Sequence, residues 1–250
     1  SSDVCSSDLE PRISNKGNVP EDAAFAMDWF QAKLSATQLE VDSMLIEFRL
    51  SEALKTIYGL IWDDYCSWYL EWIKPGYEQP IHTTVFEKSI AFYDDLLQLL
   101  HPFMPFLTEE IWQHIAERTP EQALIIAEYP TLTAYNEKLI ADFEFAAEVI
   151  AGIRTIRKDK NIAMKDAVAL KVVNHENAST YFDSIIVKLG NLSDLEYVTD
   201  KVDGALTYRV KSNEYFIPVS GNIDIAAEIA KLTEELKYTQ GFLRSVQGKL

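Results

Sequence analysis

The stretch HPFMPFLTEEIWQ, residues 101–113, decides how the first half of the chain is organised. It places Pro102 and Pro105 between two apolar segments that both have helical periodicity. A proline after His101 disfavours the helical conformation of that residue, whereas Pro105 is tolerated in the first turn of a helix. The stretch therefore predicts a tight corner between two helices.

The residues around the two prolines extend this prediction. Thr108, followed by two glutamates, favours the start of the next helix. Phe103 and Phe106 lie in the corner, and we expect both to close the apolar end of a bundle. His101 stands beside a proline, so we expect a local hydrogen bond rather than a catalytic role.

Upstream of the corner, the sequence predicts three more helices. The first begins at Glu21, because apolar residues recur every three, four or seven positions. The second has Ser51 as its N-cap and ends before Pro75, and the third runs from about Thr84 to Leu100. The apolar positions of the first helix are Met27, Phe30, Leu34, Val41, Leu45 and Phe48. Short connections between four helices indicate a helical bundle and a mainly α chain.

Downstream of the bundle the pattern changes. A helix over 138–158 is followed by a small α+β module with strands at 167–174, 205–212 and 214–220 and a helix at 178–189. Apolar residues then step by fours and threes, which is typical of one helix of a coiled coil whose partner is missing. The predicted segments are a disordered or foreign lead (1–20), the bundle (21–137), the module (138–222) and the truncated coiled-coil helix (223–250).

Composition excludes several classes of protein. The 48% hydrophobic content supports a buried core, and a net charge of −16 argues against a protein that coats nucleic acid generally, although a local basic patch remains compatible. No apolar run is long enough to span a membrane, and no secretory signal is present. The two cysteines lack the spacing of a metal site or of a disulfide framework, which suits a reducing compartment. We expect a fragment, because the chain opens on Ser1 and stops inside a helical pattern.

No catalytic site is visible in the sequence. The four histidines are scattered, paired carboxylates are adjacent and so do not share a helix face, and the nine glycines form no phosphate-binding loop. We therefore expect no catalytic residue, no metal and no cofactor in this chain.

The segment WDDYCSWYLEWIKP, residues 62–75, carries five aromatic residues. Exposed aromatic rings can stack on unpaired bases, but rings on nearly every turn of a bundle helix mostly pack in the core. We favour the core for each of these rings, and we expect Cys66 to be a small buried thiol.

One stretch is clearly basic. Residues 147–172 carry six Lys and Arg against three Asp and Glu, and Arg154, Arg157 and Lys158 share one helix face by their spacing. This face either contacts phosphates or is a solvated helix end. Further candidates for phosphate contact are Lys160 and Lys165, close behind in sequence, and Arg49 at the junction of the first two helices.

The motifs resemble a known family. HPFMPFLTEEIWQ, together with RLSEALKTIYGLIWDDYCSWYLEWIKP, closely resembles the anticodon-binding helical domain of valine–tRNA ligases, which are class I aminoacyl-tRNA synthetases. The stretch GIRTIRKDKNI, the α+β segment and the coiled-coil start are similar to the same family in order and spacing. The resemblance covers 23–250.

The resemblance implies a tRNA-binding C-terminal fragment of a monomeric, cytoplasmic enzyme that attaches valine to its tRNA, with ATP as a substrate. The HIGH-type and KMSKS-type motifs of the class I active site do not occur here, so catalysis and editing would belong to other parts of that enzyme. The first helix of the anticodon domain and the second coiled-coil helix are also missing from the pattern. Two alternatives stay open, namely an isoleucine–tRNA ligase relative and a non-enzymatic helical or coiled-coil scaffold that binds a protein.

Overall fold

The structure is a computed structural model that describes residues 13–76, 79–130, 134–173, 180–218, 233 and 236–240. The chain divides into two compact units, 1–146 and 147–250. Most of the predicted coiled-coil helix (223–250) lies outside the described residues.

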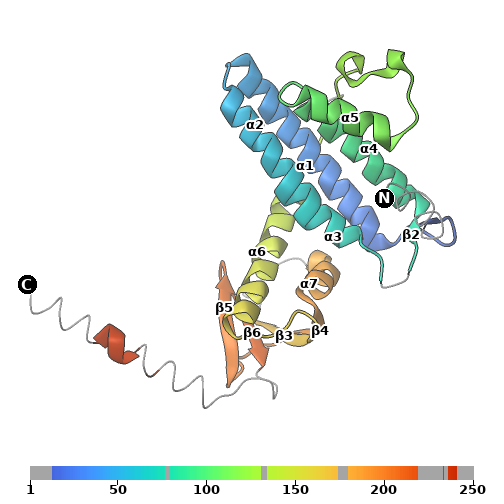
Figure 1. The fold of residues 1–250 in the computed structure, drawn as a ribbon. Helices are drawn as coiled ribbons and strands as arrows, with labels where there is room; N and C mark the ends of the chain where they lie inside the picture. Colours follow the sequence, from blue (N-terminus) through green and yellow to red (C-terminus); the bar gives the residue numbers. More distant parts are fainter. Residues whose placement is uncertain are drawn as a thin grey trace, which may run out of the picture. The chain divides into compact units, whose positions relative to one another are not determined.

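The first unit is a helical bundle (Figure 1). The described helices of this unit are α1 (Glu21–Ile46), α2 (Leu50–Gly59), a π-helix (Leu60–Tyr69), α3 (Leu70–Ile73), α4 (Thr83–Leu100), α5 (Pro105–Ile115) and two 3₁₀ turns (Pro120–Gln122 and Leu124–Ile126). The π-helix joins α2 and α3 without a break, and α1 packs against both this long helix and α4. The predicted bundle is confirmed.

Two short parallel strands lie beside the helices of the first unit. Strand β1 (Ile13–Ser14) pairs with β2 (Ile81–His82), which directly precedes α4. Ile13 and Ser14, which the sequence places in a disordered or foreign lead, therefore belong to the fold.

Aromatic side chains form the core of this unit. The Phe30 ring on α1 lies 4.9 Å from that of Phe92 on α4 and 5.1 Å from that of Tyr69 on the π-helix. Trp29 packs 4.4 Å from Phe143, which belongs to the first turns of α6 (Glu137–Asp159). These rings are almost fully buried, so the first unit is held together mainly by aromatic burial.

The second helix starts two residues earlier than the sequence predicts. Its N-cap is Arg49, without a side-chain cap bond, so Ser51 lies inside the first turn and the predicted N-cap is wrong. Phe48, which the apolar pattern assigns to the buried stripe, has a positive φ of 59° and is 86% exposed. The chain leaves α1 before Phe48, so helical periodicity no longer directs that side chain into the core.

The corner exists, but its geometry differs from the prediction. His101 keeps helical angles (φ −54°, ψ −41°), because its N–H still bonds to the carbonyl of Leu97. The break comes at Met104 (φ −136°, ψ 59°), and Pro105 begins α5 as its first residue. The bias against a helical residue before proline is thus overcome at His101.

Two further side chains of the corner, Thr108 and Phe106, lie differently from the prediction. Thr108 lies one turn inside α5 rather than at its start, where its hydroxyl donates to the carbonyl of Met104 (2.9 Å). The same oxygen lies 2.7 Å from His101 Nδ1, which confirms the local hydrogen bond expected for this histidine. Phe106 is 90% exposed, so the prediction that it closes the bundle end is wrong, whereas Phe103 is half-buried.

The second unit contains a four-stranded sheet with α6 against one face (Figure 1). Its described elements are β3 (Val168–Val173), a 3₁₀ turn (Thr180–Phe182), α7 (Asp183–Gly190), β4 (Leu192–Tyr197), β5 (Ala205–Val210) and β6 (Asn213–Pro218). The strand order is β4-β3-β6-β5, with β3 and β4 parallel and the other pairs antiparallel. The predicted strands are confirmed, and the edge strand β4 was missed.

A close contact fixes β5 on α6. The Tyr208 hydroxyl donates to the carbonyl of Val149 (3.0 Å), and the Tyr208 ring lies where a Cβ on Gly152 would stand, 2.2 Å from the nearest ring carbon. Because side chains alternate along a strand, Thr207 and Arg209 point to the other face of the sheet.

Candidate nucleic-acid interface

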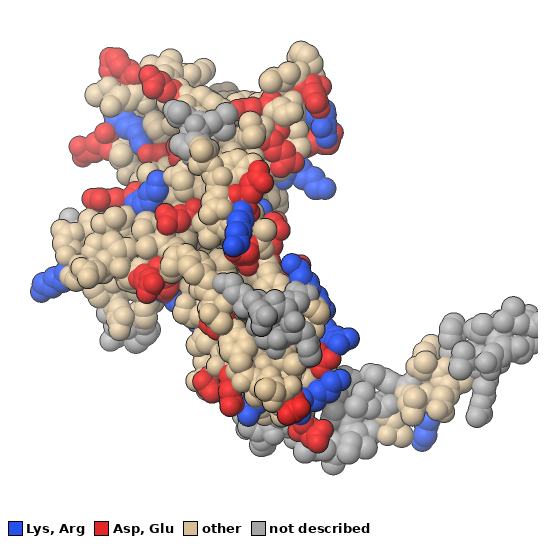
Figure 2. All heavy atoms as spheres, turned by 180° about the vertical axis from the view of Figure 1, so that it is seen from behind, with Lys and Arg blue, Asp and Glu red and all other residues tan. Residues whose placement is uncertain are grey.

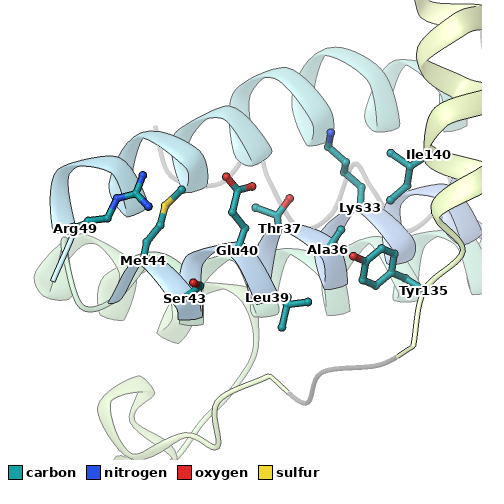
Figure 3. A pocket seen from close by; sticks show the side chains of 10 residues that line it. All are labelled: Lys33, Ala36, Thr37, Leu39, Glu40, Ser43, Met44, Arg49, Tyr135 and Ile140. Carbon is teal, nitrogen blue, oxygen red and sulfur yellow. The ribbon is translucent and has the colours of Figure 1, made fainter. Parts of the chain in front are cut away.

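A cleft of about 580 Å³ runs along α1 in the first unit (Figure 3). Its lining is mixed, with cations, hydroxyls and apolar side chains. The lining residues are Lys33, Ala36, Thr37, Leu39, Glu40, Ser43, Met44, Arg49, Tyr135 and Ile140. Arg49 and Met44 lie at one end of the cleft, while Tyr135 and Ile140 lie at the other. Such a surface can bind polar groups and flat rings together.

Arg49, a predicted tRNA contact, is held by two carboxylates. Its Nε donates to Glu52 Oε1 (2.9 Å), its terminal nitrogens reach Glu52 and Glu47, and these bonds raise the pKa of the guanidinium above its usual value, with Glu52 contributing most. All three side chains are about half exposed, so the pairs stabilise the fold little. The cluster carries a net charge of −1, so a phosphate that approaches Arg49 is also repelled by the two carboxylates beside it.

The aromatic segment divides between core and surface. Tyr65, Tyr69 and Trp72 are buried, as the sequence predicts, and Trp68 is half-buried. Trp62 is 59% exposed, so the prediction of a core position is wrong for this ring.

Trp62 has an aromatic neighbour on the surface. The Tyr58 ring is 61% exposed and stacks on that of Trp62, with centroids 6.3 Å apart and ring planes 11° from parallel. Leu54 and Leu50 continue the exposed stripe at steps of four residues. Parallel exposed rings are what proteins use to stack unpaired bases. Tyr58 is not among the residues predicted from the sequence, although its spacing of four residues from Trp62 is a signal that could have indicated the pair.

Cys66 continues the same side of the helix. It is exposed, so the prediction of a buried thiol is wrong. Partial burial nevertheless raises the pKa of the Cys66 thiol. The π-helix explains why Trp62 and Cys66 face solvent, because its wider turn moves side chains away from the positions they would have in an α-helix. Ser67 Oγ, for example, donates to the carbonyl of Trp62, five residues earlier (2.8 Å).

Arg157, one of the three cations of the predicted phosphate-contacting face on α6, does not face solvent. Arg157 is 2% exposed and donates to the backbone carbonyls of Ala163 (3.0 Å), Asp166 (2.8 Å) and Asn191 (2.8 Å). Burial lowers its pKa, and the Asp166 carboxylate partly offsets that effect. A phosphate contact by Arg157 is therefore a wrong prediction, since the guanidinium is used inside the module.

The other cations of this stretch differ in exposure. Lys158 and Lys165 are exposed, whereas Arg154 and Lys160 are half-buried and already interact with neighbouring groups. Lys165 lies in the turn between the two carbonyls of Ala163 and Asp166 that Arg157 binds. Arg157 thus positions the turn that carries one of the remaining candidates.

Charge is divided unequally between the two units. Residues 1–146 carry 9 Lys and Arg against 25 Asp and Glu, a net charge of −16, whereas residues 147–250 carry 14 of each, a net charge of zero. Figure 2 shows the basic and acidic groups intermixed on the face that it presents. An RNA backbone would meet less repulsion at the second unit than at the first.

The described residues contain neither a metal-binding cluster nor a membrane-spanning helix. Within the described residues, no three or more His, Cys, Asp or Glu side chains gather in a group that could hold a metal ion. No described helix is long and apolar enough to cross a membrane.

Comparison with known proteins identifies the family. Residues 28–173 match the family described as "Anticodon-binding domain of tRNA ligase". The chain is 54% identical over 238 residues to the valine–tRNA ligase of Christiangramia forsetii, covering 95% of this chain and 27% of that protein. It is 48% identical to that of Phocaeicola vulgatus (92% and 26%) and 32% identical to that of Enterococcus faecalis (89% and 26%).

The chain thus spans about a quarter of the length of the curated relatives it matches. The family match extends over more than half of the chain and includes the whole described bundle from Asp28 onward. On this basis the chain belongs to the family of anticodon-binding domains of tRNA ligases.

Proposed function

We propose that the chain is the tRNA-binding portion of an enzyme that uses ATP to attach valine to its tRNA. The named relatives are all valine–tRNA ligases, which favours valine over the isoleucine alternative and an enzyme over a protein-binding scaffold. The observation that carries the proposal is the exposed, parallel pair of Tyr58 and Trp62 on a bundle of the anticodon-binding family. The tRNA that accepts valine is the proposed partner.

The proposed recognition uses contacts of two kinds. Tyr58 and Trp62 stack on unpaired bases of the anticodon loop, and the α1 cleft beside Arg49 receives polar edges of the same loop. Lys158 and Lys165 contact backbone phosphates as single cations. The acidic surface of the bundle then disfavours binding away from these points, which restricts tRNA to one orientation.

The proposed chemistry of the enzyme lies outside these residues. The 250-residue sequence has no class I active-site motif, so we assign ATP use, valine transfer and hydrolysis of wrongly attached threonine to the remainder of a longer polypeptide. Such hydrolysis is needed because a pocket that holds valine discriminates poorly against a hydroxyl-bearing molecule of the same shape. The chain itself needs no cofactor in this proposal, and the enzyme is monomeric and cytoplasmic.

The proposal is tested by tRNA binding to the 250-residue chain. Fluorescence anisotropy would compare a labelled valine-accepting transcript with the same transcript carrying substituted anticodon bases. We expect the substituted transcript to bind at least several-fold more weakly, because base contacts in the loop are lost. Equal affinity for the two transcripts, or no binding by a folded chain, contradicts the proposal.

A second measurement separates binding from catalysis. Valine-dependent exchange between ATP and pyrophosphate should be absent from a preparation that binds tRNA. Exchange by the purified chain would show that the assignment of ATP chemistry to other parts of the polypeptide is wrong.

A further inference from the structure

The sheet of the second unit has a charged cluster on the face opposite α6. Arg209 on β5 stands directly across from Glu214 on β6 in the antiparallel register. Tyr208, the neighbour of Arg209, turns towards α6 and is anchored there by Val149. Alternation along the strand therefore fixes Arg209 on the opposite face.

Glu214 joins two cations in this cluster. Its Oε1 accepts a hydrogen bond from Arg209 Nη2 (2.5 Å), and its Oε2 lies 3.5 Å from Lys201 Nζ. Glu214 is 9% exposed, whereas the side chains of Lys201 and Arg209 are 75% and 68% exposed. Burial acts to raise the pKa of Glu214, but the two cations outweigh burial, so its pKa lies below the usual value.

The cluster carries a net charge of +1. Glu214 uses each of its oxygens for a different cation, so a single buried carboxylate holds two exposed cations close together. Arg49 shows the opposite arrangement, because one cation lies between two exposed glutamates. Lys171 and Glu196, on β3 and β4, form a neutral pair at 3.0 Å.

A hollow of about 430 Å³ opens at this cluster. It is lined by Lys201, Thr207, Tyr208, Arg209, Glu214 and Phe216. Thr207 is exposed and adds a hydroxyl donor beside the two cations. The hollow thus offers ammonium, guanidinium and hydroxyl donors to one ligand, and these are the groups that bind phosphate oxygens.

We propose that Lys201, Arg209 and Thr207 bind a backbone phosphate of RNA at the face of the sheet opposite α6. The proposal rests on the proposed function, because it takes the bound RNA to be tRNA. A phosphodiester carries one negative charge, which matches the net charge of the cluster. A nucleoside triphosphate carries several, and the cluster has no further cation to balance them. Glu214 is the positioning residue, since it fixes the two cations without facing solvent itself.

The location of the cluster supports this assignment. It belongs to the unit of zero net charge, so that unit exerts no net repulsion on a polyanion, whereas the first unit carries −16. Lys201 and Arg209 lie far along the chain from the basic stretch of α6. A search for runs of basic residues in the sequence therefore does not find this phosphate contact.

The test is the salt dependence of tRNA binding by the 250-residue chain. The double variant Lys201→Ala with Arg209→Ala should bind several-fold more weakly at low salt. The slope of log K against log salt concentration should become shallower by about 0.7–0.9, because one phosphate contact is lost. Lys201→Ala and Lys171→Ala are a matched pair: each removes one lysine, but only Lys201→Ala should flatten the slope clearly, because Lys171 is neutralised by Glu196.

Two further measurements test whether a variant that fails to fold affects the result, and whether the site prefers an RNA backbone phosphate to free phosphate. Arg209→Lys keeps the positive charge and should keep most of the slope. This variant still tests the site if the double variant fails to fold. Inorganic phosphate, compared with chloride at equal ionic strength, should not displace tRNA. Displacement by millimolar phosphate would overturn the assignment to an RNA backbone.

The failure of this inference differs from the failure of the proposed function. If the unaltered chain binds the transcripts with original and substituted anticodon bases equally well, the proposed function fails. If it responds to them while the double variant keeps the affinity and slope of Lys171→Ala, the phosphate site is refuted alone.

Discussion

The guanidinium of Arg157 donates a hydrogen bond of 2.8 Å to the backbone carbonyl of Asn191, 34 residues further along the chain. Asn191 ends α7 in the left-handed conformation (φ 49°) and leads directly into β4. The same guanidinium binds the carbonyls of Ala163 and Asp166 in the turn after α6. One buried cation therefore ties the end of α6 to the start of β4.

Replacing Arg157 should destabilise the second unit. Arg157→Met keeps the length of the side chain but removes the three hydrogen bonds that the buried guanidinium donates, so we expect the free energy of unfolding to fall by about 3 kcal/mol. Urea denaturation followed by circular dichroism measures this change. Lys158→Met, one residue later and exposed, is the control and should shift stability by less than about 0.5 kcal/mol. Equal stability of the two variants would contradict a structural role for Arg157.

A second prediction concerns the contact between Gly152 and Tyr208. Gly→Ala inside a helix normally stabilises by about 1 kcal/mol. Here the new Cβ would lie 2.2 Å from a ring carbon of Tyr208, whose hydroxyl is bound to Val149. Gly152→Ala should therefore destabilise by about 2 kcal/mol, because the ring cannot move without losing its hydrogen bond.

The cause of this loss can be checked by a double variant. Gly152→Ala should be harmless or stabilising in a Tyr208→Ala background, where the clash is absent, and thermal unfolding of the four proteins gives the coupling free energy. Additive effects of the two substitutions would show that the ring contact does not determine the result.

The sequence predicts the bundle and most of the sheet because their signals are local. Helical periodicity and the β-branched runs of β3 lie within single segments. Strand β4, LSDLEY, was missed because most of its side chains are polar and exposed at a sheet edge. Local patterns cannot show which carbonyls meet Arg157, since these come from residues up to 34 positions away. They equally cannot show that Arg209 and Lys201 converge on Glu214.

Stability should depend on pH through Asp64 on the π-helix. Burial is the main cause that raises its pKa to about 6; Lys33, 3.8 Å away, lowers it in part, while Asp63 and Glu144 raise it further. The folded state thus binds a proton more tightly than the unfolded state, where the pKa is about 3.9. The contribution of Asp64 to stability is therefore most favourable below pH 4, decreases as the pH rises to about 6, and stays constant above that.

The measurement is the difference in unfolding free energy between Asp64→Asn and the unaltered chain across pH 4–8. The variant should gain up to about 2 kcal/mol relative to the unaltered chain between pH 4 and 6, after which the difference levels off. Asp28→Asn, at an exposed position of α1, provides the control for the loss of one carboxylate from this unit. A flat difference for Asp64→Asn would show that its carboxylate is not desolvated.

The last prediction concerns the exposed rings of Tyr58 and Trp62. Stacking on an unpaired base contributes about 1–3 kcal/mol per base, so replacing both rings with serine should weaken tRNA binding by roughly 10-fold or more. Both side chains are about 60% exposed, so the free energy of unfolding should change little. Tyr58→Phe keeps the ring and should keep the affinity, which distinguishes stacking from a hydrogen bond of the hydroxyl.

The control for this prediction is Phe106→Ser, which removes another exposed ring, 90% accessible, from α5 of the same unit. A general apolar effect would weaken binding equally in both variants, whereas base stacking at the Tyr58–Trp62 pair affects only the serine double variant. Quenching of tryptophan fluorescence by bound tRNA gives a second readout, because Trp62 is the most exposed of the tryptophans whose side chains the structure describes. If quenching persists unchanged in Trp62→Phe, and the serine double variant binds like Phe106→Ser, the stacked pair plays no part in recognition.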